Sequence, residues 1–195
     1  MYLMSHTHCW MEAVVFRSWQ SHEAPKTMPD SALVVRVPPR DDPPAAEAMS
    51  LKADRLIDAP LCPKGLILMC GEMGSMSRDL SEWADRMRAV VMVVSEKRMT
   101  MDWLREYAPR LDFILVDSDY LGDTETTIDF CLQVRRAVPS LPVVLVSSEV
   151  RSHDFTCERM MACDVTLKPP LLQTALTMGV QAAYQNNEYY NSALA

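Results

Sequence analysis

Five short apolar runs, separated by segments with helical spacing, constrain the fold of this chain more than any other feature of its sequence. The runs cover residues 65–70, 90–94, 112–116, 142–146 and 165–167. Apolar residues recur at helical spacing in the segments that follow, which are 77–89, 101–111, 124–138, 152–162 and 171–190. Strands that are apolar on both faces are covered by helices on both sides. The alternation therefore predicts a doubly wound α/β domain with a five-stranded parallel sheet flanked by helices.

Proline is concentrated before this alternating region. Eight of the 13 prolines lie in the first third of the chain, and residues 37–46 read Val-Pro-Pro-Arg-Asp-Asp-Pro-Pro-Ala-Ala. Proline fixes φ and lacks the backbone donor that helices and central strands need. We therefore expect residues 1–63 to form a disordered, proline-rich tail or linker and residues 64–191 to form the α/β domain. Within the tail, the sequence predicts a lone strand at Leu33–Val37 and a short helix at Glu12–Gln20.

The composition argues against several classes of function. A formal net charge of −7 disfavours a basic surface for nucleic acid. No apolar run approaches the ~20 residues of a membrane-spanning helix. None of the six cysteines forms a C-x-x-C pair, and several lie in apolar runs, where a thiol packs as a small hydrophobic group. We therefore expect a cytoplasmic protein without disulfides that binds neither nucleic acid nor membranes.

Polar side chains collect where the predicted strands end. Asp117 follows the third strand, Ser147 the fourth, and Lys168-Pro169 the fifth. In doubly wound sheets, ligands and chemistry gather at the carboxyl ends of the strands. We therefore expect Asp117, Ser147 and Lys168 to lie at one edge of the sheet and to form the functional site.

This order of residues resembles the receiver domain of two-component response regulators, over roughly residues 64–187. The stretch Leu-Pro-Val-Val-Leu-Val-Ser-Ser at 141–148 is especially similar to the family's fourth strand. The resemblance implies that Asp117 is the phosphoacceptor and that Ser147 hydrogen-bonds the phosphoryl oxygen. It also implies that Lys168 pairs with the acid and its phosphate, and that the peptide bond from Lys168 to the next residue is cis.

The same resemblance implies a function and partners. A histidine kinase or phosphotransfer protein would donate the phosphoryl group, and the chain would act in phosphorelay signal transduction as a stand-alone receiver. It would carry no DNA-binding or enzymatic output domain and would not itself be an enzyme. A downstream protein would dock on the face formed by the fourth helix, fifth strand and fifth helix, and a homodimer would use that face too.

Phosphorylation of a carboxylate also needs a cation. Mg²⁺ neutralises the phosphoryl oxygens and prefers several hard oxygen ligands. The family supplies two acids at the end of its first strand, where this chain has Cys70 and Gly71. Glu72 and Asp119 could replace part of that set. The sequence therefore predicts a weak Mg²⁺ site at Asp117, Asp119 and Glu72.

Two alternatives stay open from the sequence. One is a pseudo-receiver that binds proteins without phosphorylation, in which Lys168 pairs with Asp117 as a structural salt bridge. The other is a small nucleotide- or metabolite-binding α/β protein that cradles a phosphate in the turn from Gly71 to Ser77. A purely structural interpretation of that turn makes Ser77 the N-cap of the next helix, as Asp123 is predicted to cap a later one.

Overall fold

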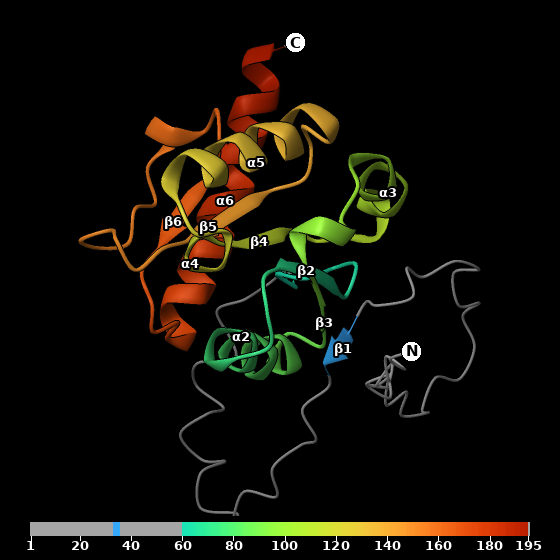
Figure 1. Ribbon diagram of the computed structural model, residues 1–195, viewed down its shortest axis with the longest axis vertical. Coiled ribbons are helices and arrows are strands. Elements are labelled where there is room, and N and C mark those ends of the chain that lie inside the picture. Colours follow the sequence, from blue (N-terminus) through green and yellow to red (C-terminus); the bar gives the residue numbers. More distant parts are fainter. Residues whose placement is uncertain (1–32, 36–59, 195) are drawn as a thin grey trace, which may run out of the picture.

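A six-stranded sheet forms the centre of the domain. The computed structural model describes residues 33–35 and 60–194, and Figure 1 shows their arrangement. The strands lie in the order β1-β3-β2-β4-β5-β6. Their bounds are β1 Leu33–Val35, β2 Leu66–Cys70, β3 Val90–Val94, β4 Ile114–Asp117, β5 Val143–Val146 and β6 Val165–Leu167.

Five of these strands, β2 to β6, run parallel, which confirms the predicted α/β fold. The chain passes from β2 outward to β3 and then crosses back to β4 on the other side of β2. This reversal in strand order defines a doubly wound sheet, and it lies between β2 and β4.

The strand β1 adds an antiparallel edge that the sequence predicted only as an isolated strand. Leu33 lies opposite Val93 and Val35 lies opposite Val91, so β1 pairs with β3. Most of the predicted tail at 1–63, including the helix expected at Glu12–Gln20, lies outside the described residues.

Helices cover both faces of the sheet. They are α2 Ser75–Arg86, α3 Met101–Tyr107, α4 Ser118–Leu121, α5 Thr124–Ala137 and α6 Gln173–Leu194. One apolar core, between the sheet and the helices α2 and α6, includes Trp83 and Leu176. A second core, between the opposite face and the helices α3 and α5, includes Leu104 and Val134. No helix in the described part of the chain is both long and apolar enough to cross a membrane.

The helix predicted at 152–162 is wrong. This segment contains only the short 3₁₀ turn Cys157–Arg159. The backbone of Asp154 instead pairs with Thr166 of β6, donating its N–H at 2.7 Å and accepting at 2.8 Å. The Asp154 carboxylate also accepts the N–H of Thr156 at 3.0 Å, a local bond that competes with helix formation. The docking face predicted from the fourth helix therefore lacks that helix.

Candidate functional site

The three residues predicted to form the site do follow adjacent strands. Asp117 is the last residue of β4 and lies opposite Val146 of β5, which in turn lies opposite Leu167 of β6. Ser147 directly follows Val146, and Lys168 directly follows Leu167. The backbone therefore brings Asp117, Ser147 and Lys168 to one edge of the sheet, as the sequence predicted.

Asp117 is a buried carboxylate that serves as a helix cap. Its side chain has one oxygen, Oδ1, that accepts the backbone N–H groups of Asp119 at 3.1 Å and Tyr120 at 3.2 Å. These bonds make Asp117 the N-cap of the short helix α4. The residue is only 8% exposed, and burial raises the pKa of its carboxyl group. The N–H of Tyr120 opposes that shift, while the negative charge of Asp119 adds to it.

Gly71 and Cys70 occupy the places where the resemblance expects two acids. A Cβ atom added to Gly71 would lie 3.2 Å from the Cβ of Asp117 and 3.0 Å from the Cε of Met69. The backbone at Gly71 thus passes directly beside the Asp117 carboxylate and leaves little room for a side chain. Cys70 is fully buried, and burial raises the pKa of its thiol to about 12, so it stays protonated at neutral pH.

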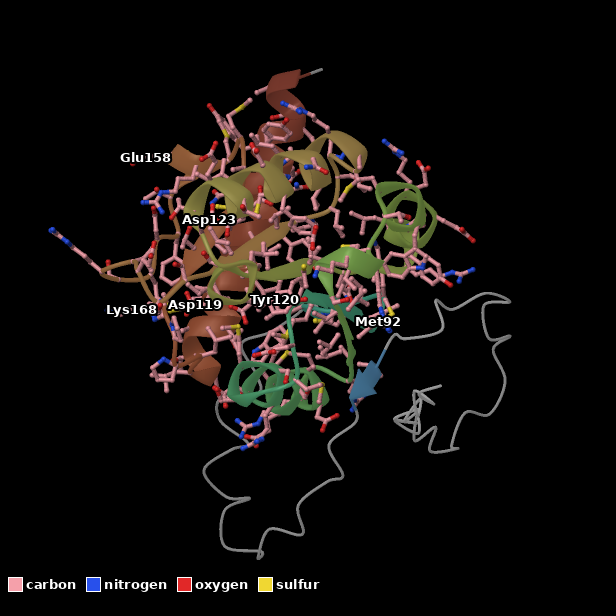
Figure 2. All side chains as sticks on the ribbon, viewed as in Figure 1. Met92, Asp119, Tyr120, Asp123, Glu158 and Lys168 are labelled. Atoms are coloured by element: carbon pink, nitrogen blue, oxygen red, sulfur yellow. The ribbon has the colours of Figure 1, made fainter. Side chains whose placement is uncertain are left out.

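The two acids that could replace the missing pair, Asp119 and Glu72, have different surroundings. Asp119 lies on α4 near the carboxyl ends of the strands (Figure 2), and its Oδ1 accepts the N–H of Ser148 at 3.1 Å. That bond ties α4 to the segment after β5. Glu72 is exposed in the loop after β2, and of the groups that act on the pKa of Asp117 its charge has the smallest effect.

A magnesium ion would need several of these oxygens around one point. Within the described part of the chain, no group of three or more His, Cys, Asp or Glu side chains is placed to hold a metal ion. The Mg²⁺ ligands named from the sequence, Asp117, Asp119 and Glu72, therefore stay a prediction. Their present arrangement does not fit the ion.

Ser147 is buried at the start of the segment after β5. It is 5% exposed, its N–H donates to the carbonyl of Leu167 at 3.0 Å, and its hydroxyl oxygen accepts the N–H of Glu149 at 3.3 Å. Its hydroxyl therefore stabilises the turn after β5. This role leaves the hydroxyl proton available to a further acceptor.

Lys168 bonds to a backbone carbonyl and not to the carboxylate that it was expected to face. Its Nζ donates to the carbonyl of Arg151 at 3.3 Å, and no ion pair joins it to Asp117 among the described residues. The predicted salt bridge is therefore wrong. The expected cis bond is also misplaced, because the cis peptide joins Pro169 to Pro170.

His153 is the site residue that sequence reasoning missed. Its Nδ1 accepts the backbone N–H of Lys168 at 3.0 Å, and its ring stacks on Phe155 with the centroids 5.8 Å apart. The segment that carries it was predicted to be helical, but His153 lies outside any helix, beside the first residue after β6. The sequence signal was the polar stretch Ser152-His153-Asp154, which suits turns better than helices.

The turn from Gly71 to Ser77 is a compact helix start. Gly74, not Ser77, is the N-cap of α2, which corrects the predicted cap. The Ser77 hydroxyl accepts the Gly74 N–H at 2.9 Å and donates to the Gly74 carbonyl at 3.1 Å, and Ser77 is 1% exposed. A hydroxyl so engaged does not reach a bound phosphate. The cap predicted at Asp123 is confirmed, since its Oδ1 accepts the N–H of Thr126 at 2.7 Å.

Comparisons with known proteins found solved structures with low sequence identity to this chain. No protein-family model matches the chain, and no curated protein matches it. A response regulator receiver domain protein from Clostridium thermocellum is 10% identical, with a TM-score of 0.48, over 64% of this chain and 98% of that one. A pilus assembly-related protein from Burkholderia pseudomallei is 21% identical, with a TM-score of 0.47, over 62% of this chain and 90% of that one. The fold assignment rests on the strand order and register described above.

Proposed function

We propose that this chain is a receiver-like interaction module that binds other proteins without phosphorylation of Asp117. The observation that carries the proposal is the set of partners around that carboxylate. Asp117 caps α4, has Gly71 against it in place of an acid, and lacks the charge of Lys168, which bonds to Arg151. A carboxylate that attacks phosphorus needs positive charge to offset the repulsion between the two groups. The described site supplies little of it.

The proposal includes no enzymatic activity. The thiols of Cys62 and Cys70 have pKa values raised to about 12, mainly by burial, so neither is a ready nucleophile. The edge of the sheet that would carry chemistry is instead filled by turns and helix caps. This supports a binding role, which we place in the cytoplasm.

Intact-mass measurement after treatment with a small phosphodonor, such as acetyl phosphate, tests the proposal. We expect no phosphoryl adduct on the native chain, with or without Mg²⁺. We also expect the native chain and Asp117→Asn to cross-link to the same proteins in the cells that make them. An Mg²⁺-dependent adduct that is lost in Asp117→Asn and kept in the control Asp123→Asn would overturn it.

A second candidate is the phosphoacceptor function itself, with a histidine kinase or phosphotransfer protein as donor and a downstream protein as target. The observation in its favour is the register that aligns Asp117, Ser147 and Lys168 along three adjacent strands. This function requires Lys168 to leave the Arg151 carbonyl and turn toward Asp117. Accordingly, Lys168→Gln should lower any adduct seen in the mass measurement, whereas the matched control Lys97→Gln should not.

A further inference from the structure

The segment that joins β5 to β6 leaves one face of the sheet without a helix. Right-handed crossovers that step in the same direction along a sheet place their connections on the same face, so this segment lies on the face covered by α3 and α5. It contains the 3₁₀ turn Cys157–Arg159 and no α-helix (orange in Figure 1). The other connections between the parallel strands each carry an α-helix. The helical layer on this face is therefore one helix short.

Leu145 of β5 shows the effect of this incomplete layer. It belongs to the apolar core beneath α3 and α5, as does Val116, its neighbour on β4. Val116 is fully buried, whereas Leu145 is only partly buried. The other partly buried residues of β2 to β6, Leu66 and Val90, begin their strands, but Leu145 lies inside its strand. The cover on this face is therefore incomplete above β5.

Two exposed apolar side chains border the same place. Ile128 of α5 is 43% exposed, and Met161, shortly before β6, is 62% exposed. Residues seven apart on a helix point in directions about 20° apart, so Ile128 points the same way as Arg135. Arg135 pairs with Asp164, three residues after Met161. Ile128 therefore lies on the side of α5 that faces the segment carrying Met161, and we call Ile128, Leu145 and Met161 the open patch.

We propose that residues 10–20 of the same chain dock on the open patch as a helix. These residues read Trp-Met-Glu-Ala-Val-Val-Phe-Arg-Ser-Trp-Gln and lie outside the described residues. They include the helix that the sequence predicts at Glu12–Gln20. At about 100° per residue, an arc of about 140° contains Met11, Val14, Val15 and Trp19. The opposite side of the helix carries Ala13, Arg17 and Gln20. An apolar stripe of this width suits a helix that packs on one side only.

Charge and reach both favour this occupant. Residues 1–22 carry one acid, Glu12, and one base, Arg17, which cancel, so the segment is not repelled by a chain of net charge −7. From Leu33 of β1, the chain back to Gln20 spans up to ~43 Å when it is extended. The strand β5 lies four strand spacings from β1, or about 19 Å. The chain is therefore long enough to carry residues 10–20 past the helical layer to the open patch.

Covalent attachment favours this segment over a helix from a separate protein. A segment tethered by a short flexible linker meets its site at an effective concentration of about millimolar. A free partner at a lower concentration displaces it only by binding the patch more tightly. Residues 10–20 thereby control access to the open patch, whatever the state of Asp117.

Photo-cross-linking in the full chain tests the docking. The photoreactive residue p-benzoylphenylalanine in place of Ile128 should cross-link to residues 10–20 of its own chain, as identified by mass spectrometry of the joined peptides. The matched control carries the same residue in place of Met178, an exposed apolar position on α6, which covers the other face of the sheet. We expect at least tenfold less of the product from the control. No product from position 128, or a product that joins only two different chains, would contradict the docking.

Two substitutions distinguish docking from random capture of a nearby segment. Val15→Glu places a charge within the apolar stripe and should remove the cross-link from position 128. Ala13→Glu adds the same charge on the opposite side of the helix and should leave the cross-link in place. Equal yields of cross-link from the two variants would show that the apolar stripe does not bind the patch.

Thermal melting gives a second measurement that needs no cross-linker. Val15→Glu should lower the melting temperature by about 3 °C, and Ala13→Glu should not. In the background Ile128→Glu the patch is already disrupted, so Val15→Glu should cause no further decrease. Equal decreases in the two backgrounds would contradict a contact between residues 10–20 and the open patch.

Discussion

The guanidinium of Arg135 and the carboxylate of Asp164 form a buried ion pair, with Nη2 and Oδ1 2.8 Å apart and side-chain exposures of 2% and 0%. The other carboxylate oxygen accepts the N–H of Val143 at 2.7 Å, and the guanidinium lies 4.7 Å from the ring centre of Tyr190. Burial raises the pKa of Asp164 and the nearby arginine opposes that shift. The pair therefore joins α5, β5, β6 and α6 at one point.

Replacing Arg135 by methionine should destabilise the domain strongly. The change leaves the Asp164 carboxylate buried without its counter-charge, which typically costs about 3–5 kcal/mol. Urea unfolding followed by circular dichroism measures the loss. The exposed neighbour gives a control, because Arg136→Met should change the free energy of unfolding by less than ~0.5 kcal/mol. The double variant Arg135→Met/Asp164→Asn should recover part of the loss, and a double variant no more stable than Arg135→Met would argue against the ion-pair explanation.

Replacing Asp117 by asparagine should stabilise the domain at neutral pH. Burial raises the pKa of Asp117 in the folded state, so its protonated carboxyl group favours folding. This contribution is fully present below the unfolded pKa of about 3.9 and is lost as the pH rises through the folded pKa. Asparagine removes the buried charge and keeps an oxygen to cap α4. The melting temperature of Asp117→Asn relative to the native chain should therefore increase from pH 4 to pH 7.

The residue Asp123 provides a control of opposite sign. Its pKa is lowered, first by the N–H and then by the hydroxyl of Thr126, so its contribution is present above the unfolded pKa and lost as the pH falls. The melting temperature of Asp123→Asn relative to the native chain should decrease over the same pH range. Parallel trends in the two variants would contradict this account.

The sequence predicted the layers of the fold because the information lies in local periodicity. Continuous apolar runs such as Val90–Val94 and amphipathic segments such as Thr124–Ala137 carry their own burial pattern. The register at the carboxyl edge follows from the parallel order of the strands. It was therefore predictable that Asp117, Ser147 and Lys168 would come to one edge.

The directions of the site side chains could not be predicted in the same way. Lys168 instead donates to the carbonyl of Arg151, directly before residues 152–162, which do not form the predicted helix. That failure results from the long-range pairing of Asp154 with Thr166, which no local pattern encodes. The resemblance therefore placed the residues at the correct edge of the sheet but named the wrong partner for Lys168.

The bond between His153 and the backbone of Lys168 should order the loop after β5. In His153→Phe the stacking on Phe155 can persist, but the acceptor for the Lys168 N–H is lost, at a cost of about 0.5–1.5 kcal/mol. We expect faster hydrogen exchange of the Lys168 amide with little change at Leu167. Unchanged exchange at Lys168 would show that the bond does not hold the loop.

A single methyl group at Gly179 should disturb the contact between α6 and β6. A Cβ there would lie 2.9 Å from Cδ2 of Leu167, closer than packed side chains allow. Alanine is better than glycine in a helix by about 1 kcal/mol, but overpacking costs about 1–3 kcal/mol, so Gly179→Ala should be neutral or destabilising. Adding Leu167→Val should stabilise Gly179→Ala while it destabilises the native chain. If it destabilises both chains equally, the close approach is not the cause.

The antiparallel strand β1 has a consequence for how the protein resists aggregation. Without it, the five residues of β3 would present an open row of backbone donors and acceptors, which is a template for strands of other molecules. Leu33–Val35 covers that row along β3. At the opposite border of the sheet, the single pairing of Asp154 with Thr166 interrupts the corresponding row of β6. Both borders of the sheet are thus blunted by short segments. A chain from which residues 1–35 are removed should expose β3 and form intermolecular sheet more readily than the full chain.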